Sequence, residues 1–211
     1  MSDSTKRFIF IFVFFAGLFL SAIHPRDYFT WFLEVFPALV TFGVLALTYN
    51  RFRFTDMVYV LILMECYILY VGGHYTYAEV PLFNWIRDYL GHTRNNYDKL
   101  AHFTQGFIPA MVVREFFVRL EIIARKSWLP LIVVCVCVTI SVLYEFLEWF
   151  VAVATGEAAE AFLGTQGYVW DTQSDMLMAM IGATTALFTL ARWQDRQIDA
   201  LLKSRQINER G

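Results

Sequence analysis

The sequence predicts an all-α membrane protein, a polytopic bundle of about six transmembrane helices with both chain ends in the cytoplasm. Of its 211 residues, 58% are hydrophobic and only 17% are charged, an apolar share well above that of soluble domains. The apolar residues fall into six runs of roughly the length that a spanning helix needs. Lysine and arginine gather on one predicted side of these runs.

The first three runs cover residues 8–23, 31–48 and 57–73. Two basic residues precede the first run, as in a signal peptide, but Leu20 stands where a cleavage site needs a small residue. We therefore interpret it as an uncleaved span. Pro37 lies inside the second run, and the third carries an acid, Glu65, near its middle.

The last three runs cover residues 98–120, 128–154 and 174–191. They complete a single six-helix transmembrane domain over residues 1–191, and residues 192–211 form a short charged cytoplasmic tail. Between the third and fourth runs, apolar residues at helical spacing predict a short helix on the outer leaflet. These residues are Leu82, Phe83, Trp85, Ile86, Tyr89 and Leu90.

The basic residues set the predicted orientation. With the N-terminus inside, all but four of the 17 lysines and arginines face the cytoplasm, as the positive-inside rule requires. The four on the outer side are Arg26, Arg87, Arg94 and Lys99.

Composition also limits the partners. The formal net charge of -2 indicates no nucleic-acid partner, so the expected partner is membrane lipid. The three cysteines lie in apolar runs without CxxC spacing, which predicts neither a disulfide framework nor a thiolate metal site. The oligomeric state is left open.

Ionisable residues converge at one predicted depth, in the outer third of the bundle. Such residues are costly in lipid and face an interior or a cavity. Residues three or four apart share one face of a helix, and three helices each present such a pair. The pairs are Asp98 with His102, Glu145 with Glu148, and Asp171 with Asp175.

Simpler interpretations stand beside a functional site. Asp98 and Asp171 also fit helix caps, where a carboxylate satisfies free backbone amides. Glu148 also fits an interface position beside Trp149. His102 and Glu145 lie further into their helices, so capping explains neither.

An enclosed excess of carboxylates needs shared protons, a bound cation or a basic ligand. A divalent metal ion such as zinc, manganese or iron suits mixed histidine and carboxylate ligands. The hypothetical metal ligands are Asp98, His102, Glu145, Glu148, Asp171 and Asp175, with His74 and Glu65 as additional candidates.

Three functions stay open, and whether the chain is an enzyme is among the open questions. The first is a membrane enzyme for a lipid or lipid-linked substrate, with His102, Glu145 and Asp175 as catalytic residues. The second is a transporter or ion-coupled carrier, which Glu65 favours. The third is a non-catalytic membrane protein whose polar cluster holds a structural cation.

Three sequence elements carry a family resemblance. Residues 96–103, NYDKLAHF, resemble the DKxxHF element of VanZ-like membrane proteins, and residues 145–148 and 170–182 occupy the places of its later acidic elements. The chain departs from that family in having the Glu145/Glu148 pair where a glutamate–glutamine pattern is commoner. Over nearly its whole length the chain is similar to the YjdF-like inner-membrane proteins of bacteria. The resemblance implies a multi-pass location in the cell inner membrane and defines no activity.

Overall fold

The computed structural model describes residues 2–156 and 160–208, and within them every regular element is a helix. The long helices are α1 (Asp3–Ser21), α2 (Tyr28–Thr48), α3 (Asp56–Tyr75), α5 (Tyr97–Arg119), α6 (Leu129–Thr155) and α8 (Asp171–Asn208). The short ones are α4 (Pro81–Leu90), the 3-10 turn η1 (Lys126–Trp128) and α7 (Glu160–Leu163).

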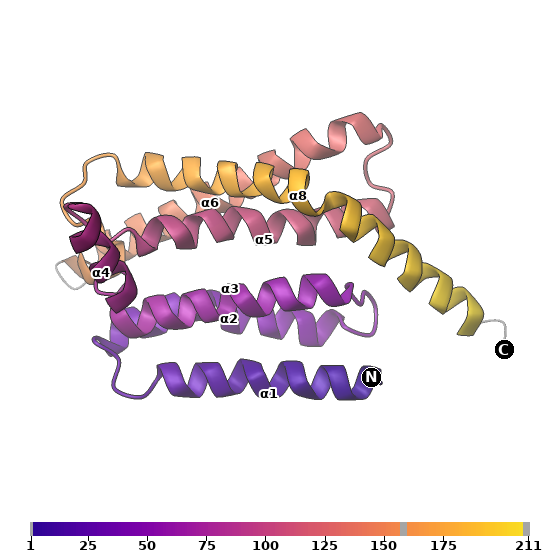
Figure 1. Cartoon of the computed structure of the whole chain (residues 1–211), viewed down its shortest axis with the longest axis horizontal. Helices are drawn as coiled ribbons and strands as arrows, with labels where there is room; N and C mark the ends of the chain where they lie inside the picture. The colour runs from indigo at the N-terminus through magenta and orange to yellow at the C-terminus, as the bar shows by residue number, and fades with distance from the viewer. Residues whose placement is uncertain (1, 157–159, 209–211) are drawn as a thin grey trace.

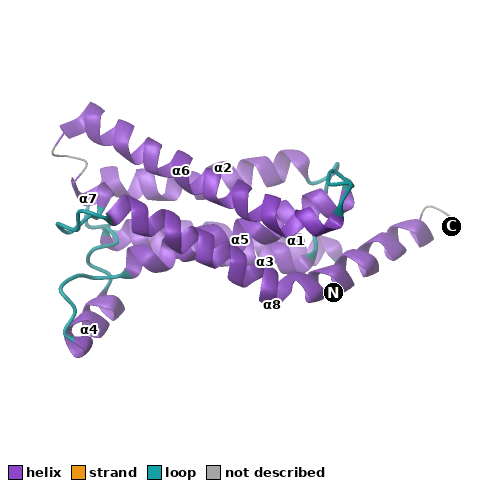
Figure 2. Ribbon diagram, turned by 90° about the horizontal axis from the view of Figure 1, so that it is seen from above, coloured by secondary structure: helices purple, strands orange, loops and turns teal. Residues whose placement is uncertain are grey.

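The long helices run side by side along one axis (Figure 1). Both chain ends lie at the same end of the bundle, while α4 lies across the opposite end. The view from above places α7 and its loops at the α4 end too (Figure 2). The amphipathic helix expected near residues 82–90 is therefore present, and its Leu82, Trp85 and Tyr89 are exposed.

Five of the long helices are long and apolar enough to cross a membrane: α1, α2, α3, α6 with η1, and α8. The sixth, α5, has 23 residues but carries many polar ones. It packs against α3, α6 and α8, so its side chains face other helices instead of lipid. The all-α membrane bundle is confirmed, whereas the count of six spans stays a prediction.

The two prolines that lie inside long helices do not end those helices. Pro37 lies within α2 and Pro109 within α5, and both helices continue past them. A membrane helix tolerates proline in this way when neighbouring helices satisfy the backbone groups that proline leaves without a hydrogen bond. Pro37 therefore does not interrupt α2.

The closest helix packing joins α5 and α8 through two glycines. A Cβ built on Gly106 would lie 1.8 Å from the Ala179 carbonyl oxygen, and one on Gly182 would lie 1.9 Å from that of Phe103. Small residues let helix backbones approach closely within a membrane bundle. The approach fixes the rotation of α5 against α8 and thereby decides which side chains meet above it.

Polar contacts hold the same two helices at the end where the chain termini lie. Arg114 donates to Gln194 at 2.8 Å and to Asp195 at 2.7 Å. Gln194 is fully buried and also donates to the Met111 carbonyl. Packing of α8 thus continues past residue 191, and the proposed boundary of the cytoplasmic tail stays a prediction.

Replacing Gly106 or Gly182 by alanine should lower the stability of the bundle by about 1–3 kcal/mol, because the added methyl group overpacks the α5–α8 contact. Chemical unfolding of the purified protein in detergent measures the change. The matched control is Gly43→Ala, because a Cβ at Gly43 meets nothing within 4 Å. Equal stability of all three variants would contradict the packing account.

Candidate functional site

The first turns of α5 and α8, at the end of the bundle where α4 lies, bring four of the expected side chains together. Asp98 and His102 begin α5, Asp171 and Asp175 begin α8, and all four are buried. Each pair is four residues apart and so lies on one helix face. The two faces meet because α5 and α8 are in close contact just below them.

Two fixed cations lie among these carboxylates. The Lys99 ammonium donates to Asp171 at 2.8 Å and to Asp175 at 2.6 Å. The Arg94 guanidinium donates to Asp171 at 2.6 Å and contacts Asp98 at 3.4 Å. Among the described residues, the Asp98 and Asp171 carboxylates bond to these cations and not to backbone amides, so capping does not explain them.

His102 is held between two helices. Its Nδ1 lies 2.9 Å from the Gln105 side-chain oxygen and 4.0 Å from a carboxylate oxygen of Glu145 on α6. Its Nε2 lies 3.4 Å from Asp98. That oxygen of Glu145 is buried and has no hydrogen-bond partner within residues 2–156 and 160–208. An unpaired buried carboxylate oxygen is costly, which marks this position as unusual.

Three of the clustered residues have the geometry of a metal site. Asp98, His102 and Asp175 each offer one ligand atom, and these atoms all lie within 4.8 Å of one another. Two carboxylates and one imidazole suit zinc, manganese or iron.

Three candidates make no hydrogen bond or ion pair to this cluster among the described residues. The described contacts include no hydrogen bond or ion pair from Glu148, which is half-buried on α6. His74 instead contacts the Ser21 carbonyl through Nδ1 at 2.9 Å and so joins α3 to the end of α1. Glu65 lies on α3, where one of its oxygens is buried without a partner in the described part of the chain.

Sequence reasoning missed several polar residues around the cluster. Arg94 was assigned only to the outer loop, and because it precedes α5 no helix spacing links it to Asp98. The Gln166 side-chain amide makes two hydrogen bonds to the Asn95 backbone: its oxygen accepts from the Asn95 N–H and its nitrogen donates to the Asn95 carbonyl, both at 2.9 Å. No sequence signal links these two loop residues, which are 71 positions apart.

Glu34 was also missed. It is a buried acid on α2 and accepts a hydrogen bond from the Tyr144 hydroxyl at 3.4 Å. The Tyr144 ring in turn lies beside His102, with 6.2 Å between ring centroids. An acid inside a predicted span was the signal that could have identified it.

Replacing Lys99 by methionine should destabilise the protein by about 3–5 kcal/mol, because Asp171 and Asp175 lose a shared buried partner. Unfolding in detergent measures the loss. The matched control is Lys126→Met, since Lys126 is exposed outside the bundle. Adding Asp175→Asn to the Lys99 variant should recover part of the loss. A Lys99 variant as stable as the control would show that these ion pairs contribute little.

Comparison with known proteins places the chain among membrane proteins. The model of the family described as "Predicted membrane protein (DUF2238)" matches residues 6–196. The inner membrane protein YjdF of Escherichia coli (strain K12) is 44% identical over 181 residues, which cover 86% of this chain and 87% of that protein. No solved structure matches the chain. The expected inner-membrane location and the YjdF-like resemblance are confirmed, and the chain belongs to the DUF2238 family of membrane proteins.

Proposed function

We propose that the chain is a membrane enzyme that acts on a lipid or lipid-linked substrate at the outer side of the membrane, with a divalent metal ion held by Asp98, His102 and Asp175. One observation carries the proposal. Three ligand atoms from two helices lie within 4.8 Å of one another, beside a buried and unpaired carboxylate oxygen of Glu145.

Charge balance supports a divalent ion. Asp98, Glu145, Asp171 and Asp175 carry four negative charges when ionised, and Arg94 and Lys99 supply two positive ones. The remaining two negative charges equal the charge of one such ion when His102 is neutral. Lys99 pairs with one oxygen of Asp175, and a carboxylate has a second oxygen that can serve as a ligand.

The contacts of His102 suit a metal ligand. When its Nδ1 carries the proton, that nitrogen donates to the Gln105 side-chain oxygen 2.9 Å away. The lone pair is then on Nε2, the nitrogen that faces Asp98 at 3.4 Å. Histidine ligands of metals commonly donate their other nitrogen to an oxygen acceptor in this way.

Glu145 is the best candidate for proton transfer. It lies on α6, across from the α5–α8 pair, and 4.0 Å from His102. A carboxylate oxygen without a partner among the described residues can accept a proton from an attacking group and return it to a leaving group. A metal ion at the neighbouring site would supply Lewis acidity.

A lipid-like substrate is suggested by the helix beside the site. α4 has an exposed Trp85 ring stacked on Tyr89, with 5.5 Å between centroids. Such amphipathic aromatic side chains favour the membrane interface. The buried Asn95, next to Arg94, donates to the Val80 carbonyl at 3.0 Å and to Asn84 at 2.9 Å. α4 is thus fastened to the loop that enters the site.

Ion-coupled transport is a second candidate, and Glu34 is the observation that favours it. Glu34 connects to His102 through Tyr144, so an acid in a span lies below the outer cluster. Rapid proton uptake by proteoliposomes that is lost in Glu34→Gln would support transport over an enzyme.

Purified protein should bind about one divalent ion per chain, and His102→Ala should abolish this binding. Gln105→Leu should weaken it about 10- to 100-fold, because a lost outer partner of a histidine ligand typically costs that much. Isothermal titration with zinc or manganese, together with elemental analysis, gives the stoichiometry and the affinity.

The matched control is His92→Ala, because His92 is an exposed histidine outside the cluster. It should bind metal like the unmodified chain. A metal-free protein, or equal binding by the His102 and His92 variants, would refute the metal site.

Lipid profiles of membranes with the unmodified chain and with Glu145→Gln then test the enzymatic role, and identical profiles would refute it.

A further inference from the structure

A crevice of about 460 Å³ lies between α1, α2 and α3 near the end of the bundle that holds the chain termini. Its inner walls are apolar and include Phe10, Leu45 and Leu63. The stacked rings of Phe14 and Phe42, with centroids 4.6 Å apart, join α1 to α2 beside it. The site formed by α5 and α8 lies at the opposite end of the bundle.

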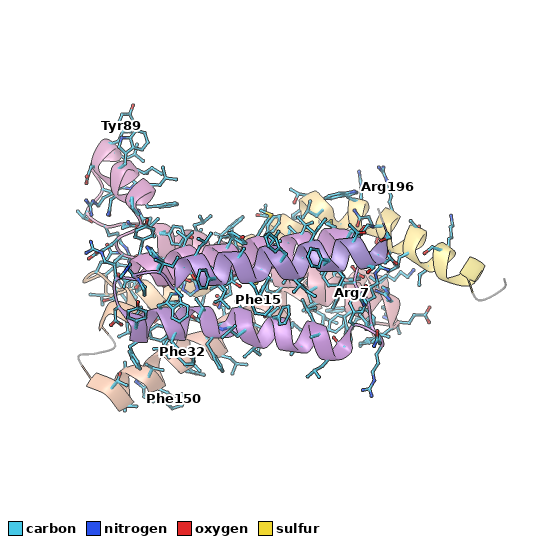
Figure 3. The ribbon with its side chains drawn as sticks, turned by 90° about the horizontal axis from the view of Figure 1, so that it is seen from below. Arg7, Phe15, Phe32, Tyr89, Phe150 and Arg196 are labelled. Carbon is cyan, nitrogen blue, oxygen red and sulfur yellow. The ribbon has the colours of Figure 1, made fainter. Side chains whose placement is uncertain are left out.

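The mouth of the crevice carries more positive than negative side chains. Lys6 pairs with Asp56, and Arg53 pairs with Asp3, whose second oxygen it meets at 2.8 Å. Arg7 is exposed and lies over the Tyr49 ring at 5.4 Å. Among the described residues no carboxylate pairs with Arg7, so its charge is the surplus. Figure 3 shows Arg7 toward the same end of the bundle as Arg196, and Phe15 further along α1.

We propose that this crevice binds an anionic phospholipid, with one acyl chain between α1 and α2 and the phosphate at Arg7. The walls offer apolar surface from three helices, and the lining residues Ile9 and Ile11 are also exposed. A surplus cation at the mouth complements a negative headgroup. Basic residues that only set the orientation of the chain would need no apolar crevice behind them.

Native mass spectrometry of the full chain in detergent tests this proposal. Phosphatidylglycerol should bind at least tenfold more tightly than phosphatidylcholine of the same acyl chains. Arg7→Gln should weaken phosphatidylglycerol binding about fivefold, as expected for one charge at a membrane surface. Ala46→Trp should abolish it without changing any charge, because Ala46 lines the crevice and the indole would fill it.

The control for charge is Arg125→Gln, since Arg125 is exposed in the loop before α6 and does not line the crevice. It should keep the affinity of the unmodified chain. Equal loss in the Arg7 and Arg125 variants, or full binding by the Ala46 variant, would mean that lipids associate with the basic surface alone and would overturn the proposal. Circular dichroism identifies a variant that fails to fold, and Gly43→Trp, on a more central turn of α2, then controls for bulk in that helix.

Discussion

The contact between the backbones of α5 and α8 is the constraint on which the outer site depends. Gly106 meets the Ala179 carbonyl, and Gly182 meets that of Phe103, at distances that exclude any side chain. Gly106 lies one turn below His102 on α5, and its contact Ala179 lies one turn below Asp175 on α8. The backbone contact therefore sets the distance at which the first turns of the two helices present their charges.

The charged groups in those first turns are arranged as a partly neutralised cluster. Lys99 bridges two carboxylates of α8, and Arg94 bridges one helix to the other. Both cations also lie within 5.6 Å of the Tyr168 ring centroid. Such a cluster keeps charge enclosed at low cost only while all partners stay in place. Glu145, on α6, is the member with a carboxylate oxygen that has no hydrogen-bond partner among the described residues.

Periodicity and charge in the sequence were enough to predict the helices and the pairs of residues that share a face. Asp98 with His102 and Asp171 with Asp175 follow from a spacing of four, and the structure brings both pairs together. Spacing does not report helix rotation, so it did not separate Glu145, which faces His102, from Glu148, which has no described bond to the cluster. Spacing also did not predict which loop residues contact the site. Arg94, Asn95 and Gln166 meet the site through tertiary contacts that local pattern does not encode.

The low hydropathy of α5 fits its position among other helices. Among the long described helices, α5 is the one that is not apolar enough to count as a candidate span. It packs against α3, α6 and α8, and hydropathy measures suitability for lipid and not for protein neighbours. The two ends of α5 differ as well. Glu115 is buried with Arg119 at 2.8 Å and with the Thr55 hydroxyl at 2.6 Å, which anchors the inner end to the loop before α3.

Pro109 stands between these two ends of α5. Proline has no amide hydrogen, so the Gln105 carbonyl four residues earlier loses its partner in the helix. The same residue holds His102 through its side chain. A missing backbone bond makes a helix easier to bend at that point. The outer turns that carry Asp98 and His102 are therefore joined to the inner segment through a turn with one backbone bond fewer, so their placement relies on the backbone contact with α8 as well as on α5 itself.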